Sequence, residues 1–379
     1  MALCQRRFLS ISTHMNNFSP HLFVDISSHG FGHLAQAAPV LNELTRLLPR
    51  LRLTVRSGLP AEILHASVQG DFNHIAQRSD FGFVMLDAVR IDADASAAAY
   101  REQHAKWTQR VADEAGQLAR LQPDLVLSDV AYLPLAGAAQ AGIRSLSMCS
   151  LNWADLFAHF FGSEAWAAPI HSEILSAYNS AECFLRLTPG MPMNGLCRVK
   201  PIAPVAALGR DCRMTLREKL ACTSNEKTVL IAFGGVDKQV PVEQWPRSQG
   251  VRWLVPEKWG VDQVNVSSFE ALGLAFPDLL RSVDAVLTKP GYGTFTEAAC
   301  NGTPVLYLRR DDWPEQDCLI DWLKHNARCC EIGEEVLMSG VLRESLEKVW
   351  QQVAPALPCP AGAAEAAALI STLLESAKA

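Results

Sequence analysis

Short apolar runs alternate with amphipathic helical patterns along most of the chain. The run 21–27 (HLFVDIS) precedes a pattern that places Leu34, Ala37, Leu41, Leu44 and Leu48 on one helical face. Apolar runs at 51–56, 81–87, 124–128 and 144–148 predict further strands, and 101–121 predicts one long amphipathic helix. Because strands separated by helices form parallel sheets covered on both faces, this half is predicted to be an α/β domain.

The stretch 188–210 is rich in proline and glycine and breaks this alternation. Beyond it, apolar runs at 228–233, 251–255, 263–266, 284–288 and 304–308 predict a second parallel sheet. The length of 379 residues also favours two domains, because single cores stop growing at about 250–300 residues. We predict two Rossmann-like parallel-sheet domains facing a cleft. The expected boundaries are an N-terminal extension 1–19, a first domain 20–187, a linker 188–212, a second domain 213–360, and a C-terminal helix 361–379 that packs back on the first domain.

Composition narrows the class of protein. Hydrophobic residues make up 49% and charged residues 20%, and the net charge is -6. These values exclude a disordered or collagen-like chain and give no general attraction for nucleic acid or anionic membrane. The 11 cysteines show no paired metal-ligand spacing, which is typical of reduced thiols. We find no apolar run that predicts a signal peptide or transmembrane span, so we expect a cytoplasmic protein.

A glycine turn follows the first predicted strand and contains Gly30, Gly32 and His33. Its spacing differs from the GxGxxG pattern of dinucleotide sites. Asp129 follows the strand 124–128, and the carboxyl ends of parallel strands meet at one edge of a sheet. His33 and Asp129 could therefore form a pair in which the carboxylate orients a general-base imidazole. Packing or helix capping is the alternative role for each residue, and also for His29 in the same turn.

The segment 284–317 carries the sharpest pattern. A predicted strand is followed by a glycine loop, Lys289, Pro290, Gly291, Tyr292, Gly293 and Thr294, which opens a helix. Free N–H groups at a helix start can bind a diphosphate, and Glu297 lies about one turn further on, where it could bind ribose hydroxyls. After the next predicted strand comes a polar set suited to sugar hydroxyls, with Arg309, Arg310, Asp311, Glu315 and Gln316. An ordinary strand–helix–strand unit is the alternative.

Three further features carry weaker signals. Gly234 and Gly235 follow a strand and could face the phosphates, although glycine pairs are common in α/β domains. Phe269 could touch a nucleotide base or could equally lie in the core. Asp92-Ala93-Asp94 has the Asp-x-Asp pattern of metal-dependent transferases but lies in an alanine- and serine-rich loop, so we interpret it as solvated charge. We therefore predict no metal site and no cofactor.

These motifs resemble the GT-B superfamily of nucleotide-sugar glycosyltransferases. Gly32-His33-Leu34, with Pro39 shortly after, is similar to the Gly-His motif of plant UDP-glycosyltransferases and of the bacterial peptidoglycan N-acetylglucosaminyltransferase. The His-Gly-Phe-Gly-His stretch 29–33 and the segment 289–311 look most like the glycosyltransferase-like N-terminal domain of plant L-arabinokinases. Two departures are visible: the plant donor signature has a Trp and a His before the glycine loop, and its closing Asp-Gln is Glu315-Gln316 here.

The resemblance implies a function and roles for the two domains. The first domain would bind the acceptor, and the second would bind a nucleotide-diphosphate sugar, UDP-linked in the family. His33 would be the catalytic base, with Asp129 as its partner, in a metal-independent inverting transfer to an acceptor hydroxyl. The acceptor stays unidentified, and no nucleic acid or membrane-spanning partner is expected. Two alternatives stay open: a catalytically silent nucleotide-sugar sensor, and a UDP-sugar epimerase.

Overall fold

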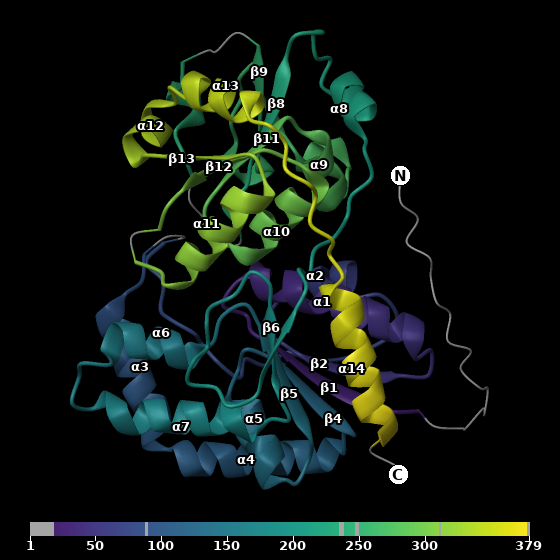
Figure 1. Ribbon diagram of the computed structural model, residues 1–379, viewed down its shortest axis with the longest axis vertical. Coiled ribbons are helices and arrows are strands. Elements are labelled where there is room, and N and C mark those ends of the chain that lie inside the picture. The colour runs from purple at the N-terminus through teal and green to yellow at the C-terminus, as the bar shows by residue number, and fades with distance from the viewer. Residues whose placement is uncertain (1–18, 88–89, 235–238, 247–249, 311, 377–379) are drawn as a thin grey trace.

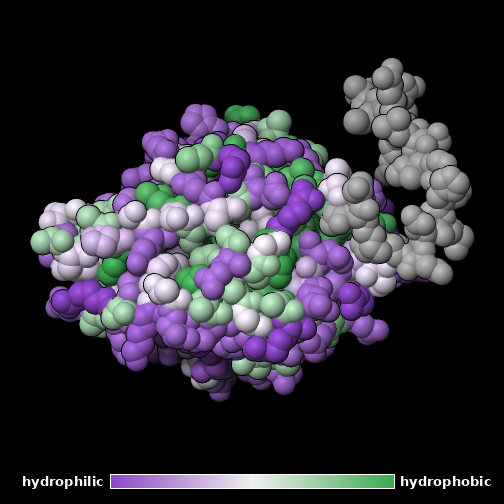
Figure 2. Space-filling model, turned by 90° about the horizontal axis from the view of Figure 1, so that it is seen from below, coloured by the Kyte–Doolittle hydropathy of each residue, from purple (hydrophilic) through white to green (hydrophobic). Residues whose placement is uncertain are grey.

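The computed structural model describes residues 19–87, 90–234, 239–246, 250–310 and 312–376, which form two stacked α/β units (Figure 1). The predicted extension 1–19 therefore lies outside the described residues except for its last position. Polar residues cover most of the face of the N-terminal unit seen in Figure 2, with apolar residues scattered among them. Within the described residues, no helix combines the length and the apolar character needed to cross a membrane.

The N-terminal unit is a parallel sheet covered by helices on both faces. Its strand order is β3-β2-β1-β4-β5-β6-β7. The strands are β1 (His21–Ile26), β2 (Arg52–Arg56), β3 (Asn73–Ile75), β4 (Leu125–Asp129), β5 (Ser145–Cys149), β6 (Phe184–Leu187) and β7 (Val199–Ile202). The helices are α1 (Phe31–Leu47), α2 (Ala61–Ser67), α3 (Ala93–Ala105), α4 (Trp107–Leu121), α5 (Leu133–Gln140), α6 (Trp153–Phe161) and α7 (Ala167–Ser180).

The C-terminal unit repeats the plan with the strand order β10-β9-β8-β11-β12-β13, again all parallel. The strands are β8 (Lys227–Ile231), β9 (Val251–Val255), β10 (Val266–Ser268), β11 (Ala285–Thr288), β12 (Val305–Leu308) and β13 (Cys329–Ile332). The helices are α8 (Arg213–Lys219), α9 (Phe276–Ser282), α10 (Tyr292–Asn301), α11 (Glu315–Asn326), α12 (Glu334–Ser339) and α13 (Arg343–Gln351), with short 3₁₀ turns at Val242–Gln244, Glu257–Trp259 and Glu270–Leu272. The prediction of two parallel-sheet α/β units is confirmed.

Three local predictions need correction. The run 81–87 does not form a strand. Its only β-pairing among the described residues is an isolated bridge between Met85 and Ile91. Its apolar residues pack against neighbouring aromatic rings instead of a sheet. The predicted helix 101–121 is two helices, α3 and α4, which meet at Lys106. The segment 188–212 contains β7, which completes the edge of the N-terminal sheet, so it is not a linker throughout.

The last helix, α14 (Gly362–Ser376), leaves the C-terminal unit and lies against α1 of the N-terminal unit (Figure 1). Ala366, Ala367, Ile370 and Leu374 are buried in the same core cluster as residues of α1. The Arg144 guanidinium donates to the carbonyl oxygen of Leu373 at 3.2 Å, and the Gly362 amide donates to the Pro204 carbonyl at 3.0 Å. A Cβ on Gly362 would lie 2.0 Å from the Ala203 carbonyl oxygen, so this close approach requires glycine.

Candidate active site

Adjacent strands at the centre of the N-terminal sheet bring a histidine and an aspartate together. Strands β1 and β4 are parallel neighbours, with Ile26 opposite Asp129. His33 lies in the first turn of α1, which follows β1, and its Nδ1 is 3.3 Å from Asp129 Oδ1. Both side chains are buried, and His33 Nε2 has no hydrogen-bond partner among the described residues. Because Nδ1 is held by the carboxylate, Nε2 is the ring atom free to exchange a proton with a ligand.

Burial and charge act in opposite directions on this pair. Burial by itself lowers the pKa of His33, but the Asp129 carboxylate 3.3 Å away raises it well above its usual value. Burial also raises the pKa of Asp129, and the positive His33 ring opposes that shift. For this coupled pair we take the raised pKa of His33 as the governing effect, because a direct hydrogen bond to a carboxylate stabilises the protonated ring. The pair thus favours the state with a proton on Nδ1.

His29 differs from His33 in its hydrogen-bond partner and in the direction of its pKa shift. Its Nε2 lies 3.2 Å from the carbonyl oxygen of Phe83, and its ring stacks on Trp313 with a centroid distance of 6.1 Å. Burial and, to a lesser extent, the nearby His33 and Arg310 lower the pKa of His29 to about 3. His29 is therefore neutral and already uses one ring nitrogen on the backbone. Of the two histidines in the turn, only His33 has a carboxylate partner.

The start of α10 faces the start of α1 across the two units. A Cβ on Gly293 would lie 3.3 Å from the Cβ of Ala35 in α1. Gly291 is the N-cap of α10 and no side chain caps the helix, so its first N–H groups are available to an anion. A Cβ on Gly30, Gly32 or Gly234 would meet nothing within 4 Å, and Gly234 has a positive φ of 84°. These glycines of the two units therefore border open space.

The loop after β12 reaches across into the N-terminal unit. Trp313 is 3% exposed and packs in the aromatic cluster of that unit, beside Phe83 and His29. The Arg310 guanidinium lies over the Trp313 ring, 3.9 Å from its centroid. Glu315 accepts hydrogen bonds from the Ser150 hydroxyl at 2.6 Å and from the Trp313 indole at 3.1 Å. This loop joins the two units next to His29 and His33.

Gln316 and Lys289 also lie at this junction. The Gln316 amide exchanges two hydrogen bonds with the backbone of Arg310, so it fixes the loop. Burial and, to a lesser extent, Arg310 lower the pKa of Lys289, Glu315 opposes them, and the resulting pKa is about 7. Burial likewise lowers the pKa of Arg310 to about 10, and its Nε has no hydrogen-bond partner among the described residues. Two cations, Lys289 and Arg310, thus interact with each other at this junction.

Several other predicted site residues have their side chains elsewhere. The Tyr292 hydroxyl accepts from the Val205 amide and donates to the Thr188 carbonyl oxygen, so this buried phenol anchors the segment between the units. Arg309 pairs with Asp317 and Glu331 at the surface. Tyr292 can therefore contribute only its backbone to a ligand at the loop, and the Arg309 guanidinium has carboxylate partners of its own.

Glu297 and Phe269 are both partly buried. Burial raises the pKa of Glu297, a hydrogen bond from the Ala207 backbone opposes that rise, and the resulting pKa is about 7. Phe269 is half-buried and packs on the core of the C-terminal unit. Pro290 and Thr294 belong to the loop and first turn of α10. Gly235 and Asp311 lie outside the described residues.

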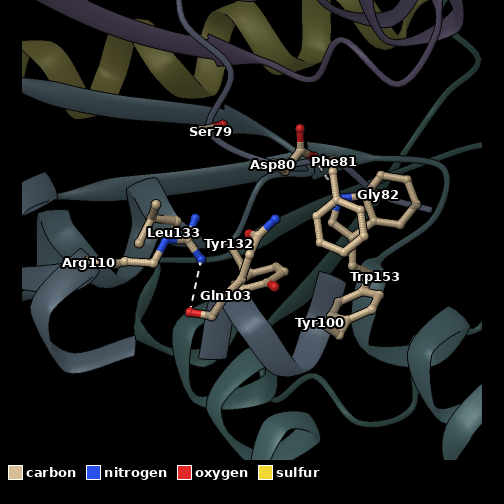
Figure 3. A pocket seen from close by; sticks show the side chains of 10 residues that line it. All are labelled: Ser79, Asp80, Phe81, Gly82, Tyr100, Gln103, Arg110, Tyr132, Leu133 and Trp153. Atoms are coloured by element: carbon tan, nitrogen blue, oxygen red, sulfur yellow. Dashed lines mark hydrogen bonds between the residues drawn. The ribbon is translucent and has the colours of Figure 1, made fainter. Parts of the chain in front are cut away.

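A small cavity of about 10 Å³ lies between the loop 79–82 and helices α3, α4, α5 and α6 (Figure 3), and the ring centroid of Trp153, which lines it, is 6.0 Å from that of His33. Asp80 lines it and accepts hydrogen bonds from the Trp153 indole at 2.8 Å and from the Ser27 hydroxyl at 3.0 Å. Burial and, to a lesser extent, Asp25 raise the pKa of Asp80, the positive His33 opposes them, and the resulting pKa is about 6. The cavity has room for about one water molecule, so it is too small to hold a sugar or a nucleotide.

Sequence reasoning missed four residues of this site: Asp80, Cys149, Trp153 and Trp313. Cys149 ends β5, next to β4, and its Sγ lies 3.8 Å from His33 Nδ1. Its position at a strand end was the signal that could have identified it, as for Asp129. Trp313 stands inside the polar cluster 309–316 and could have been identified from that position. Asp80 and Trp153 carry no comparable pattern, because loop folding brings them to the site.

Comparisons with known proteins place the fold. No protein-family model matches the chain. The chain is 25% identical over 331 residues to an L-arabinokinase of Arabidopsis thaliana; the match covers 85% of this chain. The chain spans only 31% of the length of that relative.

Solved structures match over nearly the whole chain. A calicheamicin glycosyltransferase matches with a TM-score of 0.60 and 15% identity, covering 95% of both chains. A UDP-glucosyltransferase of Polygonum tinctorium matches with a TM-score of 0.58 and 16% identity, covering 94% of this chain and 98% of that one. An Arabidopsis thaliana glycosyltransferase in complex with UDP matches with a TM-score of 0.57 and 14% identity, covering 94% and 100%. The protein has the GT-B fold, and the predicted resemblance is confirmed.

Proposed function

We propose that this protein is an inverting glycosyltransferase that moves a sugar from a UDP-linked donor to an acceptor hydroxyl without a metal ion. The observation that carries the proposal is the buried His33–Asp129 pair at the carboxyl edge of one sheet, facing the uncapped start of α10 in the other unit. The names of the structural neighbours support it: they are glycosyltransferases, and two of the structures hold UDP and dTDP.

The geometry supports a single-displacement reaction. The acceptor hydroxyl gives its proton to His33 Nε2 while Asp129 holds the Nδ1 proton. The acceptor oxygen forms a bond to the anomeric carbon as the bond from that carbon to the diphosphate oxygen breaks on the opposite face, which inverts the configuration. The leaving diphosphate is stabilised by the α10 start and by Lys289 and Arg310.

A sensor that binds the same donor without turning it over is the second candidate. The hydrogen bonds in the loop after β12 favour this candidate. The side chains of Glu315 and Gln316 bond to other protein groups, so their polar atoms are not free to bind a sugar. Such a sensor would need the α10 start but not His33. Turnover therefore separates the two functions, and donor binding alone does not.

A panel of nucleotide sugars tests the proposal. A ligand that binds only the folded protein stabilises it by about 2.7 kcal/mol at a concentration 100 times its Kd, so the thermal midpoint rises. We expect UDP-sugars to raise the midpoint and adenosine diphosphate sugars to do so less. Products from the best donor with a panel of hydroxyl acceptors are then followed by mass spectrometry. Tight binding with no product from any acceptor would favour the sensor, and no binding at all would refute both candidates.

Donor binding is expected to take up a proton near neutral pH. The pKa of Lys289 is lowered to about 7 in the free protein, so the ammonium group is partly deprotonated at pH 7.5. A bound diphosphate favours the charged form and raises this pKa, so protons move from buffer to protein. Calorimetry of UDP binding in buffers of different ionisation enthalpy measures this uptake. It should vanish in Lys289→Met, while Lys258→Met, at an exposed lysine in the 3₁₀ turn after β9, should keep it.

Activity is expected to persist in EDTA. The Asp-x-Asp at 92–94 serves the fold, since the Asp92 side chain accepts the Ala95 amide as the N-cap of α3. The α10 start, Lys289 and Arg310 provide the positive charge that a metal ion would otherwise supply. For protein first freed of bound metal, initial rates with and without EDTA should agree within error. A rate that is lost in EDTA and restored by Mg²⁺ or Mn²⁺ would contradict this part of the proposal.

A further inference from the structure

Three potential metal ligands from three different elements converge at the candidate base. They are His33 Nδ1 from α1, an Asp129 carboxylate oxygen from the end of β4, and Cys149 Sγ from the end of β5; all lie within 4.8 Å of one another. His33 Nδ1 is 3.3 Å from Asp129 Oδ1 and 3.8 Å from Cys149 Sγ. The proposed transfer reaction makes no use of the thiol.

These separations are close to those of a tetrahedral zinc centre. Zinc binds imidazole nitrogen and carboxylate oxygen at about 2.0–2.2 Å and thiolate sulfur at about 2.3 Å. At tetrahedral angles, such bonds place nitrogen and oxygen roughly 3.4 Å apart, and nitrogen and sulfur roughly 3.6 Å apart. The observed distances of 3.3 and 3.8 Å differ from these values by only a few tenths of an ångström.

The surroundings also fit a divalent cation. Asp129 Oδ2 is fully buried and has no hydrogen-bond partner among the described residues, so the carboxylate has unused acceptor capacity. A Zn²⁺ ion bound by one carboxylate, one thiolate and one neutral imidazole forms a complex with no net charge. Burying such a complex costs much less free energy than burying an isolated ion. The nitrogen, oxygen and sulfur ligands suit zinc better than Mg²⁺ or Ca²⁺, which prefer oxygen.

We propose that His33, Asp129 and Cys149 form an inhibitory Zn²⁺ site. The metal displaces one proton from His33 Nδ1 and one from the Cys149 thiol, and both go to the solvent, so the neutral ring keeps its one proton on Nε2. Nε2 then has no lone pair with which to accept the proton of an acceptor hydroxyl. Zinc would thus switch off the base without blocking the donor site. The inhibition rests on the proposed function, whereas metal binding does not.

Cobalt binding tests the site without any assay of activity. Co²⁺ substitutes for zinc, and a sulfur ligand gives a charge-transfer absorption in the near ultraviolet. We expect one Co²⁺ per chain with this absorption, lost on addition of one equivalent of Zn²⁺. Cys149→Ser and Cys149→Ala should abolish the absorption and weaken zinc binding at least roughly 100-fold in competition with a chromogenic chelator. Cys183→Ser, at a half-buried cysteine preceding β6, is the matched control and should leave both unchanged.

Inhibition is measured against each protein's own rate in chelator. Zinc should inhibit the wild type and Cys183→Ser at the concentration that fills the site, and should inhibit the Cys149 variants far less. If the sulfur-to-cobalt band is absent from the wild type, or persists without Cys149, the site is refuted. If zinc fills the site and turnover is unchanged, the inhibitory role is refuted. If no acceptor gives turnover, the proposed function fails while the cobalt result still decides the site.

Discussion

Replacing His33 with alanine is expected to lower turnover by about 10²–10⁴-fold, the usual contribution of a general base. The imidazole lies at the edge of the N-terminal sheet, and its Nε2 has no hydrogen-bond partner in the part of the chain that the structure describes. Donor affinity should barely change, because the donor is proposed to lie on α10 and the loop after β12. Turnover under saturating donor, together with the Kd for UDP from calorimetry, separates these two effects.

The partner residue provides a second test of the same assignment. Asp129→Asn should also lower turnover, since an amide neither fixes the Nδ1 proton nor stabilises the charged ring. The double variant should lose far less than the product of the two single losses, because residues that act as one unit are not additive. Independent, multiplicative losses would mean that the two side chains do not work together.

His29 is the control within the same turn. Its ring is neutral, bonded to the Phe83 backbone and stacked on Trp313, so it lacks the carboxylate that a base requires. His29→Ala should affect turnover much less than His33→Ala. The opposite order would move the base to His29 and overturn the assignment. Circular dichroism of each variant confirms that the fold is intact.

The pH dependence of kcat/KM should show the raised pKa of His33. The base must be neutral to accept a proton, and Asp129 raises the pKa of His33 well above 6.5 despite burial. The rate should therefore increase with pH, with a midpoint above 6.5. In Asp129→Asn the residual rate should have a lower midpoint, because only the lowering effect of burial remains. A midpoint that does not move would separate the pH dependence from this pair.

Much of this architecture could be predicted from local patterns. The apolar runs locate strands such as β1, β4 and β11, and a parallel sheet places their carboxyl ends at one edge. That rule is enough to predict that His33 and Asp129 come together, since β1 and β4 are adjacent in the sheet. The run 81–87 misled because its alternating apolar residues face an aromatic cluster instead of a neighbouring strand.

The contacts between the two units could not be predicted in this way. Trp313 and Glu315 contact the N-terminal unit because the two units are juxtaposed in the fold, and no local spacing encodes that contact. Tyr292 shows the converse case. Its position in a glycine loop predicts a ligand contact, but its hydroxyl bonds Val205 and Thr188. Sequence reasoning therefore identified the loop but not the direction in which this side chain points.

Replacing Arg56 with methionine is expected to destabilise the N-terminal unit by about 3–5 kcal/mol, the cost of removing one partner from a buried ion pair. Arg56 is 2% exposed at the end of β2. Its guanidinium donates to Asp25 at 2.5 Å and to both oxygens of Glu114 at 2.6 and 2.9 Å. Methionine has a similar length but no charge, so the variant would leave two buried carboxylates uncompensated.

The expected result is a fall in the thermal midpoint of roughly 6–20 °C, since 1 kcal/mol corresponds to about 2–4 °C for a unit of this size. Arg46→Met is the matched control, because Arg46 pairs with Glu43 on the exposed side of α1 and such surface pairs contribute little to stability.

Uncompensated buried carboxylates take up protons, so the loss of stability in Arg56→Met should become smaller as the pH is lowered toward 5. Asp25 also contributes to the raised pKa values of Asp80 and Asp129, so an unneutralised Asp25 would disturb the candidate base as well. An unchanged midpoint in Arg56→Met would show that the three charges are not buried together in solution.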